Sequence, residues 1–401
     1  MHESFIKLAG ILGYILVAHL VIKRLRGLWR EAAFTVLNIA ALYLSFFCGK
    51  DSRYIPTFLA YLALITFQYL MVRLFAQKSG WQPWVAFFTP ILALILIRYV
   101  PLSLSTNGHL PYGPFFIGIS YLAFRCSHLV LEIRNGLVPV PGFLAYLGFC
   151  FFVPIMPVGP INLYGNYRRA FDAEPPLIHP GRALLRILVG RVKFKFLGSI
   201  CLQLTYTNLL LDGHYHPWID LPVAMLFYYL FLYCNFSGFC DMAIGAAGLI
   251  GIPVAENFNN PFAARNVKDF WNRWHITLST WMRDVVFAPL SKFLVRLTGP
   301  AFANHAIALT IVVVFLLVGI WHGAGWNFAA FGAAHALGVV ANHYYTIGLK
   351  RWLGRDGFKA YNSNPWIHGI AVALTFCYCA ASFFLFANTF PEMKEIIAAM
   401  R

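Results

Sequence analysis

The chain has 401 residues, of which 60% are hydrophobic, 17% aromatic and only 11% charged. Because a soluble domain has about 25% charged residues, this composition excludes an ordinary soluble protein, and the apolar runs lack the alternation of a transmembrane β-barrel. The net charge of +16 comes from basic residues between the apolar runs, which favours topology signals and contact with anionic lipid over nucleic-acid binding. The sequence therefore predicts an all-α, multi-pass integral membrane protein.

Apolar runs long enough to cross a bilayer, which takes about 20 helical residues, divide the chain into predicted spans. They are 3–22, 32–49, 55–75, 83–105, 114–131, 184–211, 222–241, 303–322, 326–348 and 365–388. The first span ends in a basic segment without a small-residue cleavage site, so we expect a retained helix rather than a cleaved signal peptide. No internal repeat or low-complexity tract interrupts the chain, which predicts one integral domain over residues 1–401.

The basic loops predict the topology, because Lys and Arg accumulate on the cytoplasmic side. The segment Lys23–Arg30 therefore places the N-terminus outside the cytoplasm. The next apolar segment after Arg125–Arg134 is Pro141–Pro160, and the loop that follows it is basic again. Simple alternation would put that loop outside. Prolines near the end of Pro141–Pro160 break a helix, so we expect a re-entrant segment covered by protein or a water-filled cavity.

The most polar part of the chain is the predicted cytoplasmic stretch Glu256–Leu290. Read as one helix, it has an apolar face of Phe270, Trp274, Leu278, Trp281 and Val285. The opposite face has the polar stripe Asn272, His275, Ser279 and Arg283. This pattern predicts an interfacial amphipathic helix whose polar side faces water or lines a polar cavity.

Three motifs resemble the membrane-bound O-acyltransferase superfamily, and they look closest to its bacterial branch. They are YCNFSGFCDMAIG (Tyr233–Gly245), ENFNNPF with DFWNRWHITLSTWMRD (within Glu256–Asp284) and GIWHGAGWNFAAFGAAH (Gly319–His335). PVGPI (Pro157–Ile161) is also similar to a proline-glycine turn of the family. The specific resemblance covers about residues 110–340. That branch includes alginate and peptidoglycan O-acetyltransferases and the teichoic-acid D-alanyl transfer protein.

The resemblance implies a helical fold of about 10–11 spans plus the re-entrant segment, with a central tunnel that reaches His322 from both membrane faces. His322 matches the invariant histidine of the family's WHG motif, and His275 stands where many eukaryotic members have Asn. Asn235 stands where the family often has Asp. Further residues expected at the tunnel or substrate site are Trp321, Trp326, Asn272, Arg273, Ser279, Asn235 and Ser237.

The residues themselves support acyl transfer at His322. Transfer to an alcohol needs a base and a group that stabilises the oxyanion, and His322 lies where an apolar helix ends in Gly-rich chain. Burial favours the neutral form of the His322 imidazole, whereas a position at a helix C-terminus favours the charged form. We expect the effect of burial to be larger, so that His322 is neutral. No GxSxG, P-loop, GxGxxG or HExxH motif occurs, so the acceptor hydroxyl should attack the bound thioester directly.

Several residues keep two interpretations. His275 either takes part in the donor or oxyanion site or makes a structural hydrogen bond. A group of basic residues either binds the donor's phosphates or only follows the positive-inside pattern. These residues are Arg182, Arg186, Arg191, Lys193 and Lys195. The carboxylates of Asp241, Asp269 and Asp284 are expected in salt bridges with Arg273 or Arg283 rather than in catalysis. A lone histidine near the end of a span often has only a structural hydrogen bond, and His335 has this interpretation as well.

The sequence thus predicts a membrane-bound O-acyltransferase of the bacterial inner membrane, with no bound cofactor, no metal and no nucleic-acid partner. It would move an acyl group, preferably acetyl, from a cytoplasmic thioester (acetyl-CoA or an acyl carrier protein) to a hydroxyl of a cell-surface polysaccharide, peptidoglycan or a periplasmic transfer partner. D-alanyl transfer from a carrier protein to a teichoic-acid-like polymer is the alternative within this class. A transporter or flippase, or a non-catalytic scaffold of an envelope-modifying complex, is the alternative from another class.

Overall fold

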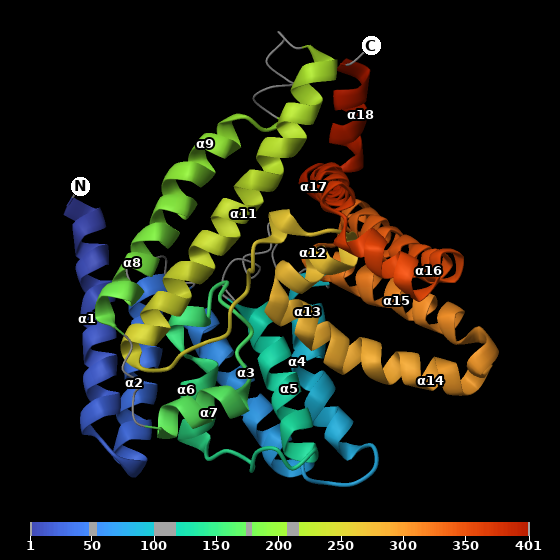
Figure 1. Ribbon diagram of the computed structural model, residues 1–401. Coiled ribbons are helices and arrows are strands. Elements are labelled where there is room, and N and C mark those ends of the chain that lie inside the picture. Colours follow the sequence, from blue (N-terminus) through green and yellow to red (C-terminus); the bar gives the residue numbers. More distant parts are fainter. Residues whose placement is uncertain (1, 48–53, 100–117, 174–178, 207–215, 400–401) are drawn as a thin grey trace. The chain divides into compact units, whose positions relative to one another are not determined.

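The computed structural model describes residues 2–47, 54–99, 118–173, 179–206 and 216–399, and its regular elements there are helices (Figure 1). Contacts between Cα atoms divide the chain into two compact units. The first comprises residues 1–191 and 239–255, and the second comprises 192–238 and 256–401. The long helix α11 (Pro217–Ile250) contributes its first part to the second unit and its last turns to the first. Parts of the predicted spans 32–49, 83–105, 114–131 and 184–211 lie outside the described residues.

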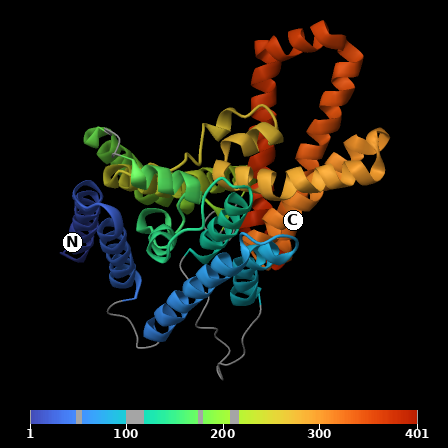
Figure 2. The same cartoon turned by 90° about the horizontal axis from the view of Figure 1, so that it is seen from below.

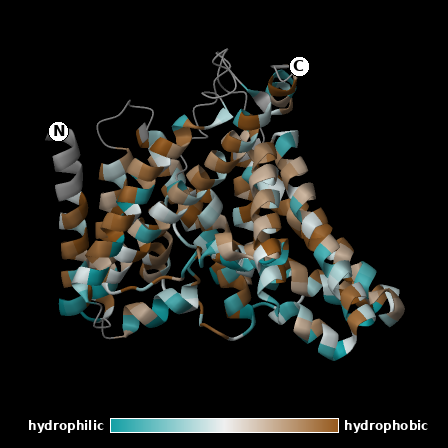
Figure 3. Ribbon diagram, turned by 45° about the horizontal axis from the view of Figure 1, so that its top comes forward, coloured by the Kyte–Doolittle hydropathy of each residue, from teal (hydrophilic) through white to brown (hydrophobic). Residues whose placement is uncertain are grey.

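Four described helices are long and apolar enough to cross a membrane. They are Ile55–Phe75, Trp218–Ile250, Pro300–His322 and Pro365–Ala387. The hydropathy colouring shows hydrophobic residues along much of the helices, with hydrophilic residues gathered in connecting segments and near helix ends (Figure 3). These helices confirm an all-α, multi-pass membrane protein; the larger number of spans and the topology stay predictions.

The first unit begins with four long helices that follow the predicted spans. Its helices are α1 (His2–Arg24), α2 (Gly27–Phe46), α3 (Tyr54–Phe75), α4 (Gln82–Tyr99), α5 (Ile119–Arg134), α6 (Phe143–Cys150), η2 (Val153–Ile155), α7 (Tyr164–Asp172) and α8 (Pro180–Arg191). Arg186 of α8 forms an ion pair with Asp241 at 3.0 Å, so this carboxylate is in a salt bridge as expected, but its partner is Arg186 and not Arg273 or Arg283.

The predicted re-entrant segment Pro141–Pro160 contains the eight-residue helix α6 and the three-residue helix η2, which together are too short to cross a bilayer at 1.5 Å per residue. Its backbone is anchored by polar side chains of α2 and α5. Asn38 Oδ1 accepts a hydrogen bond from the amide of Val153 at 3.0 Å, and the buried guanidinium of Arg125 donates to the Phe149 carbonyl. Because protein side chains satisfy the broken backbone, the irregular chain is tolerated where it is buried.

The second unit holds the motif residues. Its elements are η3 (Val192–Leu197), α9 (Gly198–Gln203), the first part of α11, η4 (Pro261–Ala263), α12 (Val267–Arg273), α13 (Ile276–Met282), η5 (Arg283–Phe287), α14 (Ala288–Thr298), η6 (Pro300–Phe302), α15 (Ala303–His322), α16 (Trp326–Ser363), α17 (Pro365–Ala387) and α18 (Phe390–Ala399). Figure 2 shows α16 and α17 running side by side in opposite directions, and α16 is kinked at Gly354, whose φ is 67°.

The prediction of one continuous helix across Glu256–Leu290 is wrong. The helix breaks at Trp274 and His275, because His275 takes the left-handed conformation with φ 47° and ψ 50°. The apolar face is still buried, with Phe270 and Leu278 at 0% exposure. His275, however, leaves the predicted polar stripe and is itself only 2% exposed. Periodicity could not show this break, since it assumes helical dihedral angles throughout.

Candidate active site

His322 is the last residue of α15, at the point where the chain turns into α16. The helix ends because Gly323 is extended, with φ −173° and ψ 165°, and Gly325 then caps α16. The two helices touch backbone to backbone: a Cβ on Gly319 would lie 2.3 Å from the Phe328 carbonyl oxygen, and one on Gly332 would lie 2.3 Å from that of Phe315. This close packing fixes the backbone that carries His322.

Aromatic rings surround the imidazole of His322, which is half-buried. Its ring centroid lies 4.6 Å from that of Trp321, 5.0 Å from that of Phe386 and 6.2 Å from that of Phe331. These rings come from α15, α16 and α17, so three helices define the environment of the histidine. Partial exposure leaves this imidazole accessible to a substrate.

His275 is held by Asn257, a residue of the ENFNN stretch. Asn257 Oδ1 accepts from the Thr277 amide at 3.1 Å and from Thr277 Oγ1 at 2.9 Å, and it lies 3.3 Å from His275 Nδ1. An amide oxygen only accepts hydrogen bonds, so the proton of a neutral His275 is on Nδ1 and the lone pair is on Nε2. The left-handed backbone of His275 is thus compensated by hydrogen bonds to a buried asparagine.

Burial lowers the pKa of His275 well below its usual value of 6.5, and the nearby charge of His322 lowers that pKa further. Desolvation penalises the imidazolium form, so His275 is neutral at physiological pH.

Trp321 is close to both motif histidines. Its ring centroid is 6.1 Å from that of His275 and 4.6 Å from that of His322. On its other side His275 packs edge-on against Phe236 of α11 at 4.7 Å. The structure therefore brings His275 of one motif together with Trp321 and His322 of another.

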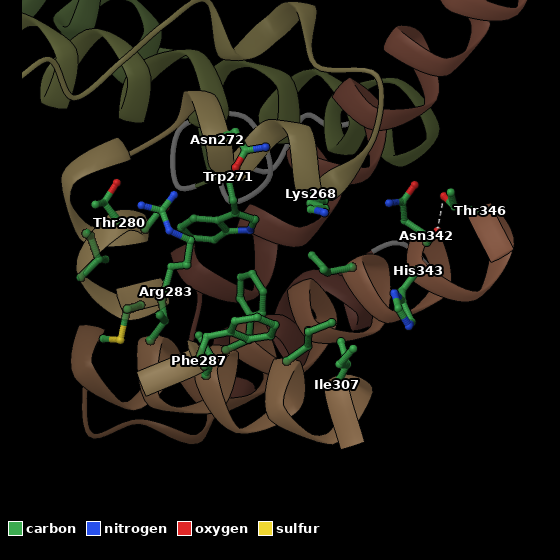
Figure 4. Close-up of a pocket in the computed structure, with 18 of the residues that line it drawn as sticks. Lys268, Trp271, Asn272, Thr280, Arg283, Phe287, Ile307, Asn342, His343 and Thr346 are labelled. Carbon is green, nitrogen blue, oxygen red and sulfur yellow. Dashed lines mark hydrogen bonds between the residues drawn. The ribbon is translucent and has the colours of Figure 1, made fainter. Parts of the chain in front are cut away.

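The second unit contains a cavity of about 590 Å³ (Figure 4), whose lining does not include His275, Trp321 or His322 themselves. Its wall includes Ile276, the residue after His275, and Val318, one helical turn before His322. Apolar side chains make up much of the lining. The exposed cations at the cavity are Lys268, Arg283 and Lys350.

The other predicted site residues separate into three groups. Asn272 and Ser279 line the cavity. Arg273 does not line it and forms an ion pair with Asp269 at 2.9 Å, as the structural interpretation of that carboxylate predicts. Trp326 is 79% exposed, so the structure does not enclose it around His322.

The two predicted residues of α11, Asn235 and Ser237, stand on either side of Phe236, whose ring packs on His275. Ser237 is 2% exposed. Asn235 is half-buried on the same helix. Asp284, the third acidic residue for which a salt bridge was expected, forms an ion pair with Arg283 at 2.9 Å. Among the described residues, no group of three or more His, Cys, Asp or Glu side chains is placed to hold a metal ion.

Sequence reasoning did not identify Asn257 or the partners of His335. Trp271 Nε1 donates to His335 Nδ1 at 3.1 Å, and His335 Nε2 lies 2.9 Å from Ser382 Oγ. Asn257 belongs to a motif quoted for the family, which was the available signal. Ser382 comes from α17, and no local pattern connects it with the other two.

Comparison with known proteins shows the family of the chain. The family model described as "MBOAT, membrane-bound O-acyltransferase family" matches residues 115–386. A teichoic acid D-alanyltransferase of Bacillus subtilis is 30% identical over 78% of this chain and 79% of its own length. The corresponding protein of Streptococcus thermophilus is 29% identical over 79% and 78% of the two chains.

Two further relatives are O-acetyltransferases. A probable alginate O-acetylase of Azotobacter vinelandii is 30% identical over 55% of this chain and 42% of its own length. A peptidoglycan O-acetyltransferase of Helicobacter pylori is 37% identical over 32% and 23% of the two chains. With the family model matching most of the chain, the protein belongs to the membrane-bound O-acyltransferase family and is a membrane-embedded acyltransferase.

Proposed function

We propose that the protein transfers a short acyl group from a phosphopantetheine thioester, presented at the cytoplasmic face of the bacterial inner membrane, to a hydroxyl of a cell-envelope polymer or of a periplasmic transfer partner. The observation that carries this proposal is that Trp321 contacts both a half-buried His322 and a buried, neutral His275, while chain neighbours of the two histidines, Val318 and Ile276, line a cavity. Coenzyme A and acyl carrier proteins share the phosphopantetheine thioester, so both are candidate donors.

His322 acts as the general base. In direct transfer the acceptor hydroxyl attacks the thioester carbonyl, the carbon–sulfur bond breaks, and the hydroxyl proton must reach a base and then the leaving thiolate. Burial and the charge of His322 lower the pKa of His275, so His275 stays neutral while the proton is on His322. A positioned general base contributes about 10²- to 10⁴-fold to the rate.

His275 has a supporting role in this mechanism. Its Nδ1 proton points to Asn257 Oδ1, 3.3 Å away, so in this tautomer it contributes an acceptor nitrogen rather than an oxyanion donor. The ring also packs on Phe236 and Trp321. We infer that His275 orients groups around His322 and keeps the proton there.

The cavity provides the donor site. Its exposed cations Lys268, Arg283 and Lys350 suit the phosphate of a phosphopantetheine arm, and its apolar lining suits the arm itself. A volume of about 590 Å³ lies in the range of small-molecule sites. From the cavity, a passage beside Trp321 would lead the thioester to His322, as the tunnel of the sequence prediction requires.

Two acyl groups are compatible with this chemistry, and one observation favours D-alanyl. The D-alanyltransferases of B. subtilis and S. thermophilus align with this chain over more than three quarters of both chains. The alginate O-acetylase match covers 42% of that protein. Acetyl transfer, the preference drawn from the sequence, is the second candidate, supported by the 37% identity to the peptidoglycan enzyme over 130 residues.

Mass spectrometry of envelope polymers tests the proposal. The strains are wild type, a deletion, and the deletion complemented at matched protein level with His322→Ala or with His305→Ala. His305 is an exposed histidine on the first turn of the same helix, where it contacts Tyr344. We expect the deletion and His322→Ala to lose one ester, which His305→Ala retains. The mass of the missing group separates alanyl from acetyl.

Two results would contradict the assignment. An ester that persists in His322→Ala but disappears in the deletion would show that His322 is not the base and would favour a scaffold. An unchanged ester content in the deletion, with altered distribution of a lipid or polymer across the membrane, would favour a transporter.

A further inference from the structure

His335 lies at the middle of a buried chain of hydrogen bonds that joins three helices. Trp271 of α12 donates from Nε1 to His335 Nδ1 at 3.1 Å. On the other side of the ring, His335 Nε2 lies 2.9 Å from Ser382 Oγ of α17. Ser382 Oγ in turn donates to the Cys379 carbonyl at 2.8 Å.

These hydrogen bonds determine which ring nitrogen of His335 carries the proton. The indole N–H only donates, so Nδ1 of His335 is the acceptor and the proton is on Nε2, which donates to Ser382. The hydroxyl then uses its own proton on the Cys379 carbonyl. Each group is satisfied by the neutral imidazole, and a second proton would place two donors against each other at Nδ1.

His335 therefore has no acid–base role. Its side chain has 0% exposure, and it does not line the cavity. Aromatic rings enclose it: its centroid lies 4.5 Å from that of Phe331 and 6.0 Å from that of Phe270. A group that no substrate can reach acts only through the residues to which it is bonded.

Trp271, the partner of His335, does line the cavity (Figure 4). Its indole packs edge-on against Phe315, a second lining residue, at 5.2 Å. The position of this large, flat side chain determines how wide the cavity is at that wall. One hydrogen bond to His335 and the ring contacts around it hold the indole in place.

We propose that His335 is a positioning residue that holds Trp271 against the cavity and thereby determines which acyl donors fit. The inference rests on the proposed function, because the cavity is taken as the donor site. Without the hydrogen bond from Trp271 to His335, the indole turns away from its position in the cavity wall. The cavity then binds the donor less tightly and has room for longer acyl groups. The effect falls on donor KM and acyl-length preference more than on kcat.

Two substitutions of His335 separate its two hydrogen bonds. In His335→Asn the amide oxygen stands near the former Nδ1 and can still accept from Trp271. In His335→Gln the amide reaches the former Nε2 position and keeps only the contact with Ser382. Trp271→Phe removes the same bond from the other side while it leaves an aromatic ring, and Ser382→Ala removes only the far end of the chain.

The measurement is steady-state acyl transfer by the full-length protein in proteoliposomes, with acetyl and butyryl thioesters of coenzyme A and with D-alanyl carrier protein as donors. We expect His335→Gln and Trp271→Phe each to raise the KM of the short donor about 10-fold, the effect of one lost hydrogen bond, with a relative gain for butyryl. His335→Asn and Ser382→Ala should stay within about 3-fold of wild type. The double variant His335→Gln with Trp271→Phe should be no worse than either single variant, because both remove one interaction.

The outcomes separate the two proposals. A wild-type protein that transfers no acyl group from any of these donors overturns the proposed function and this inference with it. An active wild type whose donor KM is unchanged in both His335→Gln and Trp271→Phe overturns only the positioning role. Equal losses of kcat and of thermal stability in all four variants, without rescue by His335→Asn, would show a merely structural network and also overturn it.

Discussion

His335 has hydrogen-bond partners on both ring nitrogens, His275 has Asn257 on Nδ1, and His322 is half-buried among aromatic rings. The three side chains are chemically identical, so their different roles come from these surroundings. A buried imidazole with both nitrogens hydrogen-bonded can act only through its partners, and a buried imidazole with one defined tautomer stays neutral. A half-buried imidazole is accessible, as the base proposed at His322 requires.

The titration of His275 gives a prediction at the residue scale. Its pKa is lowered in the folded state, so between that pKa and the unfolded value of about 6.5 only the unfolded chain binds the proton. The stability that neutral His275 contributes is therefore present above pH 6.5 and is lost as the pH falls toward the folded pKa. We expect the midpoint temperature of thermal unfolding of the detergent-purified protein to decrease when the pH is lowered from 7.5 to 5.

His275→Asn is the matched control for this pH effect. Asparagine tolerates the left-handed backbone at this position and does not titrate. The variant should lose the part of the pH dependence that His275 causes, even if its midpoint is lower throughout. An identical pH profile in the two proteins would contradict the assignment of a depressed pKa to His275.

At the scale of elements, the site depends on two breaks in regular structure. One is the left-handed residue between α12 and α13, which turns His275 into the core. The other is the glycine-rich turn between α15 and α16 after His322. The contact of α15 with α16 through Gly319 and Gly332 holds the second break in place, because side chains there would collide with backbone oxygens.

Gly332→Ala tests this helix contact. The added Cβ would lie 2.3 Å from the Phe315 carbonyl oxygen, so α15 and α16 must separate and His322 must move. We expect a loss of about 1–3 kcal/mol in the free energy of unfolding and at least a 10-fold loss of acyl transfer, since small misplacements of catalytic groups are costly.

Gly348→Ala on the same helix is the control for Gly332→Ala. A Cβ at Gly348 meets nothing within 4 Å, and alanine has the higher helix propensity. This variant should unfold at or above the wild-type temperature and retain activity. Equal behaviour of the two variants in unfolding and transfer assays would refute the role of the close contact.

At the scale of the whole molecule, the distribution of basic residues predicts how the chain is oriented in the membrane. Basic residues, which give the net charge of +16, concentrate in segments such as Lys23–Arg30. The short helix α6 is consistent with the prediction that Pro141–Pro160 enters the membrane and returns on the same side. The loops on both sides of that segment should then lie in the cytoplasm, with the N-terminus outside.

Reporter fusions measure this topology. Alkaline phosphatase, which is active only outside the cytoplasm, should be active when fused at the N-terminal side of α1 with an export-competent linker, and inactive after residue 26, 136 or 169. A green fluorescent protein fused at the last three positions should fluoresce. Phosphatase activity after residue 169 but not after residue 136 would show that Pro141–Pro160 crosses the membrane.

The sequence by itself determined the fold class and most helix positions, and it singled out His322, whose catalytic role stays a prediction. Hydrophobic runs depend only on local composition, and the motif residues stand in consecutive stretches. Its prediction of Trp326 at the tunnel gains no support, because that side chain is 79% exposed. The break at His275, the acceptor Asn257 and the chain from Trp271 through His335 to Ser382 were decided only by the tertiary structure. These features join residues far apart in sequence, and packing and hydrogen bonding between helices, rather than local periodicity, create them.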